Sequence, residues 1–89
     1  EAAPSVPAIQ DTVGWIYFKK GSIEEAYPLL TRAASELSDN PMVRYHHGMV
    51  LAQRGDKALA VAELEAALSL SKNFPGAEEA ATMLASMRE

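Results

Sequence analysis

The chain has no cysteine among its 89 residues, which excludes disulfide bonds, thiol nucleophiles and zinc sites built on thiolates. It also has no apolar run of the ~18 residues that a membrane-spanning helix needs. Basic residues are outnumbered, eight against twelve acidic ones, and the net charge is −4. Because clustered Lys and Arg supply most non-specific affinity for nucleic acid, we predict no nucleic-acid partner and no membrane span.

A catalytic pattern is missing as well. Serine and histidine occur, but no spacing of Ser, His and Asp matches a known nucleophile motif. The adjacent pairs Glu24-Glu25 and Glu78-Glu79 stand where helices are expected to begin, and carboxylates there interact favourably with the helix dipole. We therefore predict that the chain is not an enzyme and needs no cofactor.

The pair His46-His47 raises the question of a metal site. Neighbours on a helix point about 100° apart, so the two imidazoles cannot chelate one ion well. Met42, His46 and Met49 do share a helix face, and thioethers with an imidazole suit Cu(I). The alternative is that His47 replaces an apolar core residue while His46 faces a groove. We favour this alternative and predict no metal site.

What the chain does contain is a repeat of 34 residues. A fixed period of this length is typical of stacked repeat architectures, which present surfaces for binding. The residues that recur at this spacing are Gly14 and Gly48, Gly21 and Gly55, Ala26 and Ala60, Leu30 and Leu64, Ala33 and Ala67, and the prolines Pro7, Pro41 and Pro75.

Apolar residues recur at helical spacing throughout, so the predicted fold class is all-α. Gly21 and Gly55 are expected to end helices in the left-handed conformation, and Ser22, Asn40 and Asp56 to cap the helices that follow. In the fourth helix the apolar positions are Leu59, Leu64, Ala67, Leu68 and Leu70. The expected helices span residues 8–20, 23–37, 41–54, from after Asp56 to 71, and 77–88.

The repeat boundaries follow from these helices. Short turns imply antiparallel neighbours, so each repeat is a helical hairpin. The prolines at positions 4 and 7 favour an extended start. The predicted organisation is a linker at 1–7, repeats at 8–40 and 41–74, and a capping helix at 75–89, in a single domain cut from a longer repeat protein.

This pattern resembles the tetratricopeptide repeat (TPR) family, whose consensus is W-x2-L-G-x2-Y…A-x3-F…P on a 34-residue period. The first repeat has Gly14 and Tyr17, and Gln10 stands where the family has tryptophan. The second has Gly48 and Leu51 at the equivalent positions. The resemblance implies two helix-turn-helix hairpins and a cap, five antiparallel helices in a right-handed α-solenoid.

The resemblance also implies a function: the first helices of TPR hairpins line a concave groove that binds a peptide or protein segment. Asp11 and Trp15 stand where one subclass needs a cation and an amide to grip a carboxylate, so that mode is excluded. We expect Trp15 to be partly exposed in an apolar, methionine-rich groove. The alternative is that Trp15 and the methionines are core residues, as aromatic and methionine stripes at helical spacing often are. By equivalent repeat position, the resemblance assigns these residues to the groove: Asp11, Trp15, Phe18, Lys19, Met42, Tyr45, His46, Met49, Gln53 and Met83.

A second hypothesis is purely structural. In TPR stacking, Ile9 and Ile16 would pack on the last helix of a preceding repeat, so the chain would be the end of a longer solenoid and would self-associate weakly, as a homodimer, through its first helix. A narrower resemblance, to the C-terminal part of long bacterial TPR proteins of the exopolysaccharide-export type, implies a bacterial periplasmic or envelope location.

Overall fold

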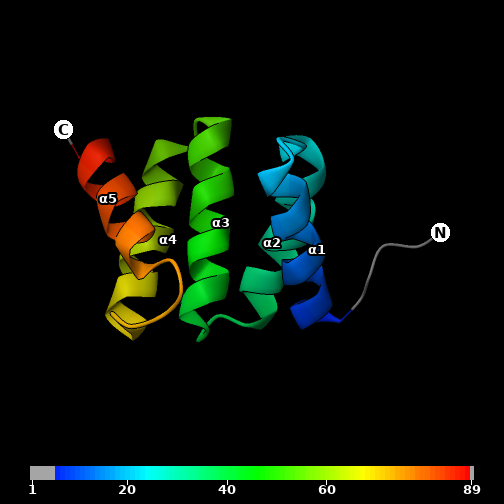
Figure 1. Ribbon diagram of the computed structural model, residues 1–89, viewed down its shortest axis with the longest axis horizontal. Coiled ribbons are helices and arrows are strands. Elements are labelled where there is room, and N and C mark those ends of the chain that lie inside the picture. Colours follow the sequence, from blue (N-terminus) through cyan, green and yellow to red (C-terminus); the bar gives the residue numbers. More distant parts are fainter. Residues whose placement is uncertain (1–5, 89) are drawn as a thin grey trace.

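The computed structural model describes residues 6–88, which form five α-helices and no strand (Figure 1). The predicted all-α fold class is therefore confirmed, and no helix end differs from its expected position by more than one residue. Residues 1–5 of the predicted linker and residue 89 lie outside the described part. The helices are α1 (Pro7–Lys19), α2 (Ile23–Glu36), α3 (Pro41–Arg54), α4 (Lys57–Leu70) and α5 (Ala77–Met87).

The helix ends follow the sequence signals only in part. Gly21 and Gly55 have φ of 84° and 88°, the left-handed conformation expected of them. The side chain of Asn40 accepts hydrogen bonds from the backbone N–H groups of Met42 and Val43, as an N-cap should. Ser22 and Asp56 occupy the N-cap positions as predicted, but their side chains make no capping hydrogen bond.

Each hairpin is closed by a glycine against a leucine. A Cβ atom on Gly14 would lie 2.8 Å from the side chain of Leu30, and one on Gly48 would lie 2.7 Å from Leu64. Both leucines are completely buried. The recurring glycines therefore let α1 approach α2, and α3 approach α4, more closely than any larger residue would allow.

The two hairpins join through α2 and α3. Val43 packs with Ala33 and Ala34, and Val50 packs with Ala26 and Leu30. The cap then closes the other side, where Leu64 and Ala67 of α4 meet Ala80 and Leu84 of α5 together with Tyr45 and Phe74. Burial thus runs continuously from α2 to α5, which makes the chain one packed unit.

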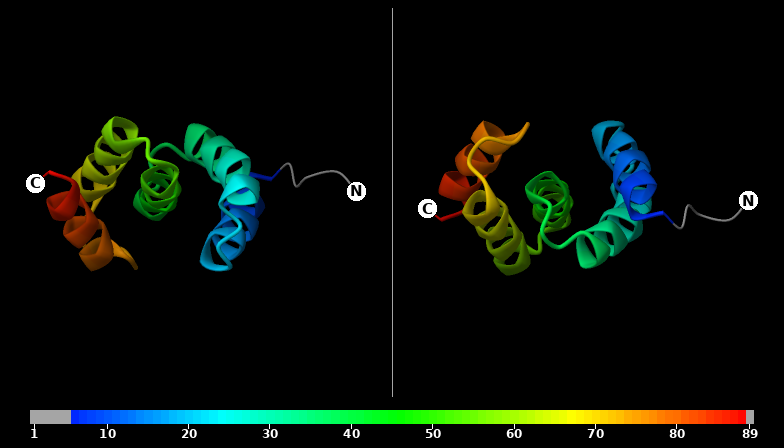
Figure 2. Two further views of the ribbon diagram at one scale, coloured as in Figure 1. Left: turned by 90° about the horizontal axis from the view of Figure 1, so that it is seen from above. Right: turned by 90° about the horizontal axis from the view of Figure 1, so that it is seen from below.

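The molecule measures 42 × 24 × 18 Å, with α1 and α5 toward opposite ends of its long axis (Figure 1). Seen from above, α2 and α4 lie on one side while α1 and α5 lie on the other, with α3 between them (Figure 2).

The prediction for α4 was wrong at two positions, because Leu59 and Leu70 are exposed. Within the described residues, no helix is both long and apolar enough to cross a membrane.

Candidate functional site

Two adjoining cavities occupy the side of the molecule formed by α1, α3 and α5, and together they are called the groove below. The larger, the α1–α3 cavity, has a volume of about 490 Å³ and receives its aromatic wall from Trp15 and Tyr45. The turn before α5 closes one of its ends. Its lining residues are Asp11, Thr12, Trp15, Ile16, Lys19, Met42, Tyr45, His46, Pro75, Gly76 and Glu79.

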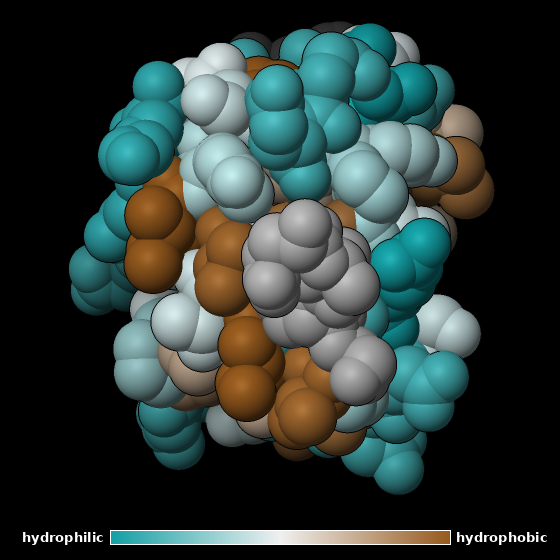
Figure 3. Space-filling model, turned by 90° about the vertical axis from the view of Figure 1, so that its right-hand side faces the viewer, coloured by the Kyte–Doolittle hydropathy of each residue, from teal (hydrophilic) through white to brown (hydrophobic). Residues whose placement is uncertain are grey.

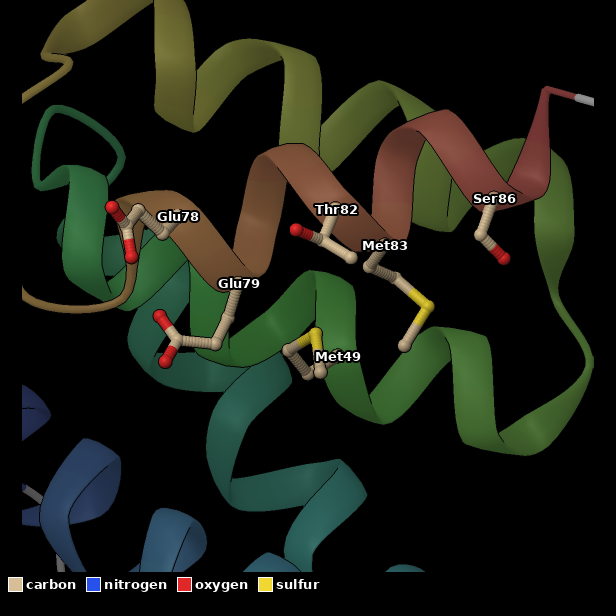
Figure 4. Close-up of a pocket in the computed structure, with 6 residues that line it drawn as sticks. All are labelled: Met49, Glu78, Glu79, Thr82, Met83 and Ser86. Atoms are coloured by element: carbon tan, nitrogen blue, oxygen red, sulfur yellow. The ribbon is translucent and has the colours of Figure 1, made fainter.

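The second, the α3–α5 cavity, has a volume of about 430 Å³ and shares Glu79 with the first. Figure 4 shows Glu79 and Met83 projecting from α5 toward α3, and Met49 projecting from α3 toward α5. Thr82, Ser86 and Glu78 complete the lining. Two thioether side chains therefore form the apolar part of this cavity, and carboxylates and hydroxyls form its rim.

A buried polar pair joins the two repeats beneath the α1–α3 cavity. Nδ1 of His46 donates a hydrogen bond of 2.8 Å to the carboxylate of Asp11, and both side chains are almost completely buried. His46 is among the residues that line this cavity. Since the pair satisfies a charge inside the protein, it fixes α1 relative to α3 where the groove is formed.

Trp15 has a double role. Its ring stacks on that of His46 with centroids 3.9 Å apart and on that of Phe18 with centroids 4.8 Å apart. It also packs against the core clusters of both repeats. The side chain is consequently half-buried. One part of it lines the groove and another part bridges α1 to α3.

Most of the predicted groove residues come together. Met42, Tyr45 and Lys19 line the α1–α3 cavity with the residues just described, and Met49 and Met83 line the α3–α5 cavity. Two predictions differ from this arrangement. Phe18 stacks on Trp15 and packs against the cluster around Leu30, and Gln53 is exposed near the end of α3; neither lines the two cavities.

Tyr45 is held by the turn that precedes α5. Gly76 has φ of 102°, and a Cβ atom there would lie 2.4 Å from the tyrosine ring, so this close approach requires glycine. The ring of Phe74 lies 5.9 Å away. Burial, and next the negative charge of Glu79, raise the pKa of Tyr45 above its ordinary value. The phenol therefore stays neutral at physiological pH, and the tyrosine forms part of the cavity wall.

Sequence reasoning missed Glu79, although the signal was present. Glu79 follows Tyr45 by one repeat length, and Tyr45 follows Asp11 by the same length. Trp15, Met49 and Met83 form a second series of this kind. The 34-residue period thus predicts both series of groove positions once the cap is treated as a third repeat.

His47 stands where the first repeat has Val13, but it is only half-buried and makes hydrogen bonds instead of packing in the core. Its Nδ1 donates to Glu63 at 3.0 Å and its Nε2 lies 3.2 Å from the hydroxyl of Thr31. Arg44 donates to the other oxygen of Glu63 at 2.7 Å. These four side chains are called the Glu63 network. Burial raises the pKa of Glu63, but the hydrogen bond and charge of His47, and then those of Arg44, outweigh it, so the pKa lies below its ordinary value.

One donor of the copper alternative is already used in another contact. Nδ1 of His46 is engaged by Asp11. Between residues 6 and 88, no group of three or more His, Cys, Asp or Glu side chains is placed to hold a metal ion. The groove therefore offers apolar contact, hydrogen bonds and charge, which are the means of binding a polypeptide.

The outer face of α1 is a second surface. Val6, Ile9 and Ile16 are all about half exposed, and their spacing of three and seven residues places them in one stripe. Figure 3 looks onto this end of the molecule and shows hydrophobic side chains gathered there. Ile16 also lies at the edge of the α1–α3 cavity, whereas Ile9 does not line it.

Comparison with known proteins gives one result. Residues 43–74 match the model of the tetratricopeptide repeat family. No curated protein and no solved structure matches the chain. The matched segment contains α4 and nearly all of α3, which is the hairpin closed by Gly48 and Leu64.

Proposed function

Since residues 43–74 are a tetratricopeptide repeat, and such repeats are in general non-enzymatic modules of protein–protein interaction, we propose that the groove of this chain binds an apolar peptide or protein segment. One observation carries the proposal. Half-buried apolar side chains, namely Trp15, Met42, Met49 and Met83, line two adjoining cavities on one side of the molecule. Methionine adapts its shape to different apolar partners, which suits such a surface.

The expected affinity is modest. Three apolar anchors of a ligand would each contribute ~1.5–3 kcal/mol before ordering costs. Those costs are large for a flexible peptide, so we expect a dissociation constant near micromolar, about −8 kcal/mol. The helical frame stays rigid, because the Asp11–His46 pair and the Trp15 stack hold α1 on α3.

The test uses the fluorescence of Trp15, the only tryptophan. Short capped peptides rich in leucine and methionine are expected to shift its emission to the blue. Replacing Trp15 itself is a poor test because its ring also packs in the core. The sharper variant is Met49→Gln with Met83→Gln, which should weaken binding about tenfold by removing apolar contact.

Leu59→Gln is the matched control. It makes a comparable change, at an exposed leucine on α4 outside both cavities, and should leave the affinity unchanged. The proposal fails if no leucine–methionine peptide changes the emission, or if the methionine double variant binds as tightly as the control.

A second candidate function is structural, the end of a longer solenoid. The observation that favours it is the stripe on α1, because the equivalent residues of α3 are covered by α2. In the isolated chain this stripe would then mediate weak self-association. Sedimentation over a concentration series should show it for the native chain and for Leu59→Asp, but not for Ile9→Asp. A strictly monomeric native chain at high concentration would contradict this candidate.

A further inference from the structure

The acidic side chains on the rim of the groove lack the arginine partners that three other glutamates have. The glutamates Glu24, Glu63 and Glu65 each pair with an arginine, namely Arg54, Arg44 and Arg88. Glu78 and Glu79 form no ion pair with any side chain between residues 6 and 88. Both lie on the rim of the groove. Two uncompensated carboxylates therefore flank the apolar surface formed by Met49 and Met83.

The opposite side of the groove adds one charge of each sign. Asp11 lies in the floor of the α1–α3 cavity, and Lys19 lies on its wall with Nζ 6.0 Å from the centre of the Trp15 ring. Because Asp11 is paired with His46, the groove carries two carboxylates without an ion-pair partner, Glu78 and Glu79, and one ammonium group. Its local charge is negative, and the negative end is at α5.

This imbalance selects a kind of ligand. We propose that the groove prefers a peptide segment in which an arginine or lysine side chain accompanies the apolar anchors. The cation would lie beside Glu79, which both cavities share, and aliphatic side chains would lie over Met49 and Met83. The charge of Glu79 already acts on Tyr45, which lines the α1–α3 cavity. A ligand cation inside that cavity would therefore also be attracted to Glu79. This inference rests on the proposed function, because it names the partner of the same groove.

The first experiment compares three capped peptides that share their leucine and methionine positions and differ only in the remaining residues, which are arginine, glutamine or glutamate. Binding is followed by Trp15 fluorescence at low salt. We expect the arginine peptide to bind about tenfold more tightly than the glutamate peptide. The difference should shrink as salt rises, since the Debye length falls from ~10 Å at 0.1 M to ~3 Å at 1 M.

The second experiment removes the charge. Glu79→Gln should weaken binding of the arginine peptide about threefold and leave the glutamine peptide unaffected. Glu25→Gln is the matched control, because Glu25 is also an exposed glutamate at the third position of its helix but lies outside both cavities. The control should bind all three peptides as the native chain does.

The outcomes separate the two proposals. If all three peptides bind equally, or the glutamate peptide binds best, the groove binds peptides but its charge preference is refuted. If Glu79→Gln and Glu25→Gln weaken the arginine peptide equally, the preference does not originate at Glu79 and the inference is wrong. If no peptide binds, the proposed function fails and this inference with it.

Discussion

The first helices of the two repeats, α1 and α3, are built alike but covered differently. Ile9 of α1 is 50% exposed, whereas Val43, one repeat length later, is 2% exposed. Ile16 is 51% exposed, whereas its equivalent Val50 is completely buried. The residue types match and the surroundings do not, because α2 covers this face of α3 and no described helix covers the same face of α1. The comparison teaches that repeat position sets the apolar pattern while the neighbouring helix decides whether it is buried.

The largest expected effect on stability comes from introducing an aspartate at Val50, compared with its equivalent Ile16 in the first repeat. Val50→Asp would leave an unpaired carboxylate among Ala26 and Leu30 and should destabilise the fold by about 4 kcal/mol or more. Ile16→Asp should change stability by less than about 0.5 kcal/mol, because its carboxylate stays in water. Urea unfolding followed by circular dichroism measures both, and equal effects would show that the face of α1 is covered.

A smaller difference is expected at the paired glycines. The Cβ of Gly48→Ala would overlap Leu64 between helices that are packed on both sides, at a cost of about 1–3 kcal/mol that a gain in helix propensity of about 1 kcal/mol offsets in part. In Gly14→Ala the helix α1 can shift outward, so the net loss should be smaller. Thermal unfolding of the two variants measures the difference. A larger loss for Gly14→Ala would mean that α1 is as confined as α3.

The smallest expected effect concerns the Glu63 network, in which Arg44, His47 and Glu63 come from the second repeat. The equivalents of Arg44, His47 and Glu63 in the first repeat are Gln10, Val13 and Leu29. The lowered pKa of Glu63 adds stability that is complete above the ordinary glutamate pKa and is lost as pH falls through the lower pKa of the folded state. Glu63→Gln should cost about 1 kcal/mol at neutral pH.

In the same variant the free energy of unfolding should also depend less on pH at acidic pH. Urea unfolding over a pH series measures this slope, with Glu25→Gln as an exposed control outside the network. An unchanged slope in Glu63→Gln would mean that the carboxylate is not held by His47 and Arg44 in solution.

Much of the fold was predictable because its signals are local or periodic. The left-handed Gly21 and Gly55, the Asn40 cap and the close approaches at Gly14 and Gly48 each depend on one residue type at one position. The groove positions were carried over from the family resemblance, and the 34-residue period extends them to Glu79. Tertiary pairing was not predictable. His47 forms a hydrogen bond with Glu63 across a hairpin, and Trp15 of the first repeat stacks on His46 of the second. Residue spacing indicates neither contact.

The most direct test of peptide binding in the groove is an NMR spectrum of side-chain methyl groups, which reports on the groove and on the outer face of α1 separately. Met42, Met49 and Met83 line the groove, and Ile9 lies on the outer face. With methionine and isoleucine methyl groups labelled, the chain is titrated with the arginine–leucine–methionine peptide at constant protein concentration. The account predicts shifts of the three methionine methyl signals and none at Ile9. Shifts at Ile9 with unchanged methionine signals would contradict it.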